Sequence, residues 1–141
     1  MNYHGRKKSE RKILIVEDDN KVLDFLHRLL SNKGYATVRA NRGSRGLRLA
    51  SIEKPDMVVL DLGLPDCSGI DVLKQLKAMD EAIQVIILTG YGSQKAARDA
   101  MELGAFDFLT KPFEVSELCA VIQKAISLKP PAVVKERHHA R

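Results

Sequence analysis

Four groups of polar residues in this sequence have side chains that suit phosphoryl chemistry, and each stands at or near the end of an apolar run. They are Glu17-Asp18-Asp19, Asp61, Thr89 and Lys111. Carboxylates that lie close together repel one another, so one of them takes up a proton unless a cation joins them. An aspartate in such a site can act as the nucleophile and form an aspartyl phosphate, while a lysine and a hydroxyl stabilise the phosphoryl oxygens.

The residue types around these positions favour a hard cation. The histidines are residues 4, 27, 138 and 139, and Cys67 and Cys119 lack metal-ligand spacing, so oxygen is the only ligand atom on offer. An all-oxygen site favours Mg²⁺, with Mn²⁺ as the alternative. Taken singly, an aspartate at a strand end is usually a helix cap or a turn former, and a lysine is usually solvated. The prediction therefore depends on the joint pattern.

Five short apolar runs alternate with five amphipathic stretches. The runs predict strands over residues 13–16, 35–40, 57–62, 85–88 and 106–110. The stretches predict helices from Asp19 or Asn20 to Gly34, over 44–53, from Ser68 or Gly69 to Met79, over 93–103 and over 114–127. Helical spacing predicts the buried sides, among them Val22, Phe25, Leu26, Leu29 and Leu30 in the first helix and Val115, Leu118, Ile122, Ala125 and Ile126 in the last.

This alternation predicts an α/β fold, a doubly wound five-stranded parallel sheet with helices on both faces. In an open sheet of this kind, ligands bind outside the carboxyl ends of the strands. Glu17, Asp18, Asp61, Thr89 and Lys111 all fall at that edge. The first and third strands are expected to be neighbours, so the three carboxylates should converge.

Length and charge narrow the possibilities further. The 141 residues, 45% of them hydrophobic, suit one domain, and no run of 18 apolar residues could span a membrane. The net charge of +5 comes from the ends, because residues 13–128 hold 14 Lys or Arg against 16 Asp or Glu. We therefore expect a basic extension over 1–10, a domain over 11–128 and a disordered basic tail over 129–141, with no direct nucleic-acid partner. Two cysteines without a disulfide framework favour the reducing cytoplasm.

Four motifs, taken in order, resemble the response-regulator receiver domain. They are Ile13-Leu-Ile-Val-Glu-Asp-Asp19, Asp61-Leu-Gly-Leu-Pro-Asp66, Ile86-Ile-Leu-Thr-Gly90 and Lys111-Pro-Phe113. Each motif alone is weak, but together they cover about residues 11–128 at the expected strand ends. The resemblance implies the strand order 2-1-3-4-5 of the chemotaxis member of that family. Residues 88–113 are similar to receivers of the nitrogen-regulation type, although the chain contains no phosphate-binding loop motif.

The resemblance implies a role for each acidic residue of the site. Asp61 resembles the phosphoacceptor. Glu17 and Asp18 resemble the acidic pair that holds Mg²⁺ together with Asp61, and the backbone carbonyl of Gly63 is the further ligand. Because Gly63 has no side chain, the phosphoryl group would stay open to water.

The resemblance also implies the residues that respond to phosphorylation. Thr89 would hydrogen-bond the phosphoryl group and move toward it, and Lys111 would pair with the phosphoryl oxygens, with a cis bond between Lys111 and Pro112. Phe108 occupies the aromatic switch position, where the ring turns inward on activation. Tyr91, two residues after Thr89, could shield the site.

These roles describe a phosphoacceptor with slow autodephosphorylation rather than a turnover enzyme. The implied donor is a phosphohistidine on a sensor histidine kinase or a phosphotransfer protein. The implied response is a switch of the face formed by the fourth helix, fifth strand and fifth helix, which would bind an unidentified downstream protein or a second phosphorylated copy. No membrane partner is expected.

We expect a single-domain regulator, because the chain starts with Met1 and no output motif follows residue 128. Two alternatives remain open. The chain could be a receiver fragment of a longer transcription regulator or hybrid kinase, or a degenerate receiver that acts by protein contact without phosphate. A small phosphatase with an aspartate nucleophile fits less well, because the second acidic residue that it needs two positions on is Gly63 here.

Overall fold

The computed structural model describes residues 11–90 and 94–128, which form five strands and five helices in alternation. The strands are β1 (Lys12–Val16), β2 (Ala36–Ala40), β3 (Met57–Asp61), β4 (Gln84–Thr89) and β5 (Asp107–Thr110). The helices are α1 (Asn20–Asn32), α2 (Gly43–Glu53), α3 (Gly69–Met79), α4 (Gln94–Glu102) and α5 (Val115–Leu128). The predicted boundaries lie within two residues of these. Tyr91 and the predicted extension and tail fall outside the described residues, so the predictions about them stay untested.

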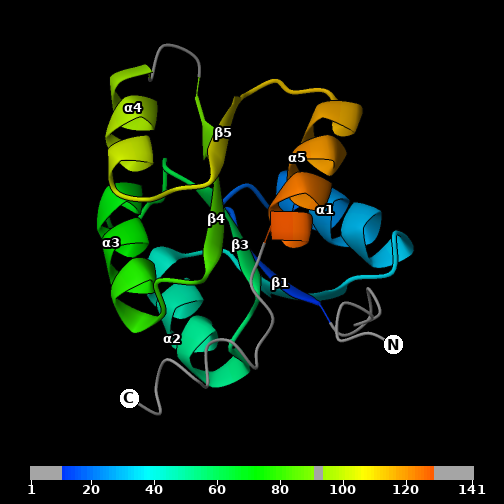
Figure 1. Ribbon diagram of the computed structural model, residues 1–141, viewed down its shortest axis with the longest axis horizontal. Helices are drawn as coiled ribbons and strands as arrows, with labels where there is room; N and C mark the ends of the chain where they lie inside the picture. The colour runs from blue at the N-terminus through cyan, green and yellow to red at the C-terminus, as the bar shows by residue number, and fades with distance from the viewer. Residues whose placement is uncertain (1–10, 91–93, 129–141) are drawn as a thin grey trace.

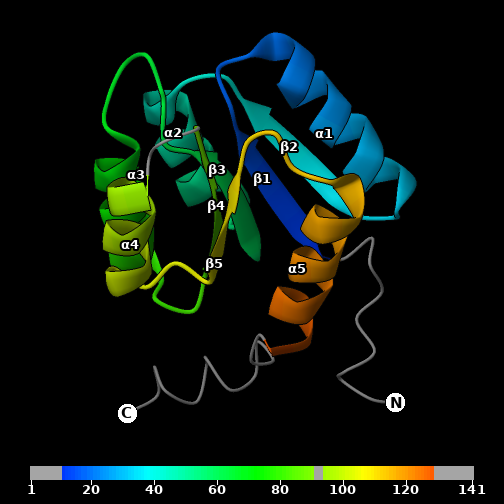
Figure 2. The same ribbon diagram turned by 90° about the horizontal axis from the view of Figure 1, so that it is seen from above.

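The strands form one parallel sheet in the order β2-β1-β3-β4-β5, which confirms the predicted fold class. Helices α1 and α5 cover one face and α2, α3 and α4 cover the other (Figure 1). The view turned by 90° shows the sheet edge-on between these two layers (Figure 2). No helix among the described residues is long and apolar enough to cross a membrane.

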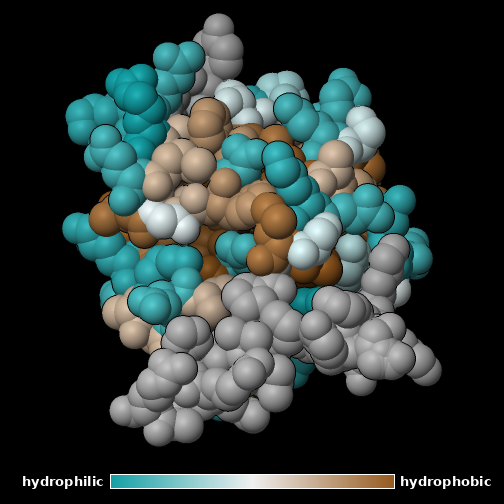
Figure 3. All heavy atoms as spheres, in the orientation of Figure 1, coloured by the Kyte–Doolittle hydropathy of each residue, from teal (hydrophilic) through white to brown (hydrophobic). Residues whose placement is uncertain are grey.

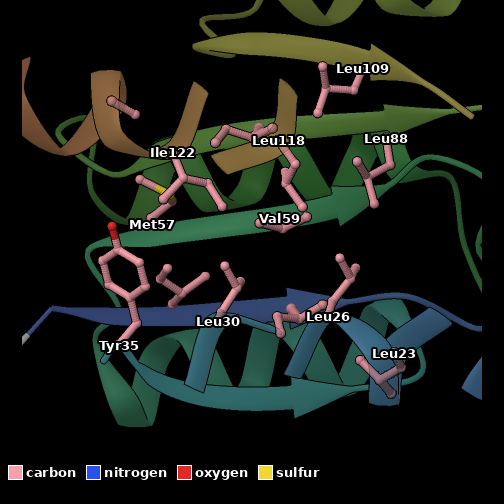
Figure 4. Close-up of a cluster of buried hydrophobic side chains, with 14 residues drawn as sticks. Leu23, Leu26, Leu30, Tyr35, Met57, Val59, Leu88, Leu109, Leu118 and Ile122 are labelled. Carbon is pink, nitrogen blue, oxygen red and sulfur yellow. The ribbon is translucent and has the colours of Figure 1, made fainter. Parts of the chain in front are cut away.

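The central strands are apolar on both faces because both faces are covered. Ile13 and Ile15 of β1 pack toward α1 and α5, whereas Leu14 and Val16 pack toward α2 and α3. Figure 4 shows the first of these two clusters, in which side chains of α1 and α5 meet those of the sheet. Every residue of β3 is buried, including Asp61 at its carboxyl end. The two cores therefore hold the acidic end of β3 in a fixed place.

Local signals set the helix ends. The Asp19 carboxylate accepts hydrogen bonds from the backbone N–H groups of Lys21 and Val22, at 2.9 and 3.4 Å, and so caps α1. Gly34 follows α1 with a φ of 100°, a left-handed conformation that glycine adopts without strain. Lys54 ends α2 in the left-handed region with a φ of 50°, one residue before Pro55, which cannot continue the helix.

The prediction of a buried side chain is wrong for two residues, Phe25 and Val115. Phe25 is 48% exposed, because the buried stripe of α1 runs through Leu23, Leu26 and Leu30, and a neighbour in sequence points about 100° away from Leu26. Val115 is 39% exposed, since it is the first residue of α5 and precedes the turn that packs on the sheet. Burial of the remaining predicted residues of both helices is complete or partial.

Candidate functional site

The carboxyl edge of the sheet brings the predicted site residues together. Val16 pairs with Leu60 between β1 and β3, so Glu17 and Asp61 follow at the same level of neighbouring strands. Asp61 pairs with Leu88 of β4, which places Thr89 one residue beyond it. Lys111 follows β5, and its backbone N–H donates to the carbonyl of Thr89 at 2.8 Å. The predicted convergence is therefore confirmed.

Three carboxylates form the centre of the site. One oxygen each from Glu17, Asp18 and Asp61 lies within 4.8 Å of the others. Glu17 and Asp61 are buried, whereas Asp18 is exposed. They line an open depression together with Asp19, Leu62, Gly63, Gly90, Ala96 and Lys111. An all-oxygen donor set that is open on one side fits a hard divalent cation that keeps some of its water.

Lys111 bridges two of these carboxylates. Its Nζ donates to Glu17 Oε1 at 2.8 Å and lies 3.5 Å from Asp61 Oδ2. Burial lowers the pKa of Lys111, but the hydrogen bond to Glu17 and the charges of Asp61 and Glu17 outweigh it, so the net pKa is raised. The ammonium thus stays charged at the place where a phosphoryl group on Asp61 would carry its negative charge.

The carboxyl group of Glu17 has a pKa that is clearly raised by its surroundings. The pKa of Glu17 is raised to about 7, mainly by burial and in part by the charge of Asp61, while the hydrogen bonds from Lys111 and from the backbone of Asp19 oppose the rise. Without a cation, Glu17 is therefore partly protonated near neutral pH, as expected for carboxylates that lie close together. A bound cation would displace that proton.

Asp61 is oriented by the loop that follows it. The backbone N–H of Gly63 donates to Asp61 Oδ1 at 3.1 Å, and the backbone N–H of Leu62 donates to the carbonyl of Leu88 at 3.0 Å. A Cβ placed on Gly63 would have Asp61 Oδ1 as its near neighbour, at 3.8 Å, which is an ordinary contact. The glycine therefore leaves free space beside the acidic group.

Thr89 and Phe108 share one face of the sheet. The register pairs Thr89 with Thr110 and Ile87 with Phe108, and side chains two apart on a strand point to the same side. Ile87 belongs to the core beneath α2, α3 and α4, so this is the α4 face. Thr89 is buried and Phe108 is 36% exposed. The bond between Lys111 and Pro112 is cis, as the resemblance implied.

Asp66 lies in the same loop as Gly63, and no role was predicted for it. Its two carboxylate oxygens accept hydrogen bonds from the backbone N–H groups of Gly43 and Ser44 at the start of α2, at 2.8 and 3.0 Å. These partners are 23 and 22 residues away in sequence, so no local pattern could have revealed the contact. The sequence offers one weak indication of this contact, because the first turn of α2 contains no acidic residue of its own.

Comparison with known proteins decides the family. Residues 13–123 match the family model described as the response regulator receiver domain. The chain belongs to this family. The predicted resemblance is therefore confirmed. Receiver domains bind a divalent cation at an acidic pocket, and the group of Glu17, Asp18 and Asp61 could hold one. Receiver domains are generally phosphoacceptors rather than turnover enzymes, and they interact with histidine kinases or phosphotransfer proteins.

Individual relatives of this receiver differ in length. Sporulation initiation phosphotransferase F of Bacillus subtilis (strain 168) is 38% identical over 118 residues, which cover 84% of this chain and 95% of that protein. Regulatory protein AtoC of Escherichia coli (strain K12) is 34% identical over 91% of the receiver, which spans only 27% of AtoC. The probable transcriptional regulatory protein SilR of Salmonella typhimurium is 38% identical, and the receiver spans 49% of its length.

Solved structures agree with the fold of the receiver. A response regulator receiver domain protein from Clostridium thermocellum has a TM-score of 0.80 and 34% identity, over 83% of this chain and 94% of that one. NtrX from Brucella abortus has a TM-score of 0.80 and 27% identity, over 92% of this chain but 29% of that one.

Proposed function

We propose that this receiver accepts a phosphoryl group on Asp61 from a phosphohistidine of a partner protein, in a reaction that depends on Mg²⁺. The observation that carries the proposal is the placement of Lys111 Nζ, 3.5 Å from Asp61 Oδ2, beside three carboxylates that lie within 4.8 Å of one another. Glu17, Asp18 and Asp61 would hold the cation with the carbonyl of Gly63. Mg²⁺ in this place supplies positive charge to the oxygens of the transferring group.

The chain's own residues then account for the transfer. A carboxylate oxygen of Asp61 attacks phosphorus, the bond between phosphorus and the imidazole nitrogen breaks, and the nitrogen keeps the electron pair. Lys111 already hydrogen-bonds Glu17 at 2.8 Å, and it would turn to the phosphoryl oxygens as charge builds up on Asp61. The Thr89 hydroxyl would donate to another of those oxygens. Water later attacks the acyl phosphate from the open side at Gly63, which gives a slow autodephosphorylation.

The response would pass along the α4 face of the sheet. Movement of Thr89 toward the phosphoryl group vacates space on the side where Phe108 lies, and the Phe108 ring would turn into it. Figure 3 looks onto this region and shows hydrophobic residues gathered across the middle, between α4 and α5, with hydrophilic residues on both sides. Large apolar residues exposed on α4, β5 and the start of α5 include Met101, Phe108 and Val115. We infer that this surface binds the downstream protein.

A second candidate function rests on the lengths of the relatives. Because the receiver spans 27% of AtoC and 49% of SilR, the same switch could drive an output domain of a longer regulator in place of a separate protein. Both versions use the same site. Both also fit a reducing cytoplasm, in which Cys67 and Cys119 would remain the free thiols that the structure shows.

Intact-mass spectrometry tests the phosphoacceptor directly. The protein is incubated with Mg²⁺ and a small acyl-phosphate donor, and one added phosphoryl group is expected. Asp61→Asn and an excess of chelator should each abolish the adduct, whereas Asp71→Asn, which removes an exposed carboxylate from α3, should retain it. Absence of both the adduct and released free phosphate in the wild-type protein would refute the proposal and favour a receiver that works without phosphate.

A further inference from the structure

Helix α2 begins without a cap of its own. Among the described residues, the side chain of its N-cap residue Arg42 makes no capping hydrogen bond, and its first turn contains no acidic residue. Arg42 and Arg45 instead bring positive charge to the positive end of the helix dipole, where it is unfavourable. A helix start of this composition needs a negative group from elsewhere in the fold.

Asp66 supplies that group from the loop that carries the site. Gly43 N donates to its Oδ1 at 2.8 Å and Ser44 N donates to its Oδ2 at 3.0 Å, so both oxygens are engaged. These hydrogen bonds, from Ser44 and then Gly43, hold the pKa of Asp66 at about 2. The carboxylate is therefore ionised at every pH at which the protein would work, and both bonds are charge-assisted.

A close contact reinforces this anchor. A Cβ on Gly43 would collide with Sγ of Cys67, the residue after Asp66, and would also lie 3.0 Å from Val72 Cγ2. The start of α2 and the 66–67 segment thus approach so closely that only glycine fits. The loop is held against α2 by a paired hydrogen bond and by shape together.

The other end of the loop is fixed at the acidic cluster. Gly63 N donates to Asp61 Oδ1 at 3.1 Å, and a Cβ on Gly69 would meet the backbone of Leu62 at 2.5 Å, so the loop also closes on itself. Between these fixed points the backbone has little freedom. The direction of the Gly63 carbonyl then depends on where Asp66 is held.

We propose that Asp66 is a positioning residue for the cation site, which acts by tying the loop of residues 62–68 to the start of α2. The inference rests on the proposed function in one respect, since it takes the Gly63 carbonyl as a ligand of Mg²⁺. Asp66 touches neither the cation nor the phosphoryl group. It sets the place of the backbone that does, as an outer partner of a metal ligand commonly does.

Binding of Mg²⁺ alone, measured by calorimetry, tests the role of Asp66 without any phosphoryl transfer. Asp66→Ala should weaken Mg²⁺ binding about 10-fold. Asp66→Asn should fall between Asp66→Ala and the wild type, because its amide keeps one acceptor oxygen. Asp71→Asn is the matched control, since it removes the same charge from the start of α3, and its Mg²⁺ affinity should stay near the wild-type value.

A purely structural cap gives a different result. It predicts that Asp66→Ala lowers the melting temperature and speeds hydrogen exchange at the amides of Gly43 and Ser44, with Mg²⁺ affinity unchanged. That outcome would overturn the inference while leaving the proposed function intact. Wild-type protein that binds no Mg²⁺ would overturn both. Wild-type protein that binds Mg²⁺ but gives neither a phosphoryl adduct nor released free phosphate would overturn the proposed function alone.

A second variant disturbs the anchor from the other side and keeps the carboxylate. Gly43→Ala should push the 66–67 segment away and weaken Mg²⁺ binding in the same direction as Asp66→Ala. Adding Cys67→Ala removes the colliding Sγ and should restore part of the affinity. Equal Mg²⁺ affinity in the wild type, Gly43→Ala and the double variant would also overturn the inference, provided that all three unfold cooperatively.

Discussion

The two halves of the functional edge are built in opposite ways. The chemical half consists of Glu17, Asp61 and Lys111, whose charged groups are joined by a 2.8 Å hydrogen bond and a 3.5 Å ion pair, with both carboxylates buried. The response half consists of two exposed apolar residues and the helices around them. Phe108 is 36% exposed and Val115 is 39% exposed. A reaction needs fixed groups, whereas a switch needs side chains that can leave their places at low cost.

The largest expected effect breaks the chemical half alone. Lys111→Ala should slow phosphorylation of Asp61 by the small donor about 100-fold, because it removes the cation that faces the developing charge. The initial rate of adduct formation by intact-mass spectrometry measures this. Lys95→Ala is the control, since the Lys95 ammonium pairs with Asp99 one turn away on the surface of α4, and its rate should match the wild type.

A Lys111→Ala variant that reacted nearly as fast as the wild type would contradict the role given to the chemical half. The charge on Asp61 would then be stabilised without the lysine, and the 3.5 Å approach of its Nζ would have no chemical meaning.

Neighbouring residues of β5 sharpen the contrast in packing. Leu109→Ala should reduce the free energy of unfolding by about 3 kcal/mol, because Leu109 is 4% exposed in the core beneath α1 and α5. Phe108→Ala should reduce it by about 1 kcal/mol or less, since the ring is partly in solvent. Urea unfolding of both variants gives the two values.

Phe108→Ala should nevertheless form the phosphoryl adduct at the wild-type rate and lose the chemical-shift changes in α4 and α5 that follow it. A variant that phosphorylates normally and shows the full set of shift changes would remove Phe108 from the response half.

The raised pKa of Glu17 predicts how stability depends on pH. Its ordinary value is 4.5 and its folded value is about 7, so the folded protein binds more protons than the unfolded chain between these values. Stability should therefore fall as pH rises from about 4.5 to 7, by an amount on the order of 3 kcal/mol from this group. Glu17→Gln should flatten this dependence, and added Mg²⁺ should stabilise the wild type most at the upper end.

Melting temperatures at several pH values, with and without Mg²⁺, check this prediction. Asp18→Asn serves as a comparison, because Asp18 is exposed and its loss should leave the fall in stability between pH 4.5 and 7 in place. A stability curve for Glu17→Gln parallel to that of the wild type would contradict the assignment.

The sequence predicted the chemical half better than the response half, for a physical reason. Charged residues at strand ends are conspicuous, and parallel strands must bring them to one edge. Exposure on a helix depends on which neighbouring residue packs against the sheet, so Val115 was predicted to be buried although it is 39% exposed. The anchoring role of Asp66 was missed because its partners, Gly43 and Ser44, are more than 20 residues away, and only the folded α2 brings them within hydrogen-bonding distance.

The smallest expected effect concerns the open side of the chemical half. Gly63→Ala should change the free energy of unfolding little, because the new Cβ would have Asp61 Oδ1 at 3.8 Å and Gly63 does not have a positive φ. It should lengthen the lifetime of the phosphoryl group, since the methyl group occupies space that attacking water uses. Decay of the adduct after removal of the donor, followed by intact-mass spectrometry, gives the lifetime. An unchanged lifetime in Gly63→Ala and in a bulkier Gly63→Leu would show that water reaches the acyl phosphate from another side.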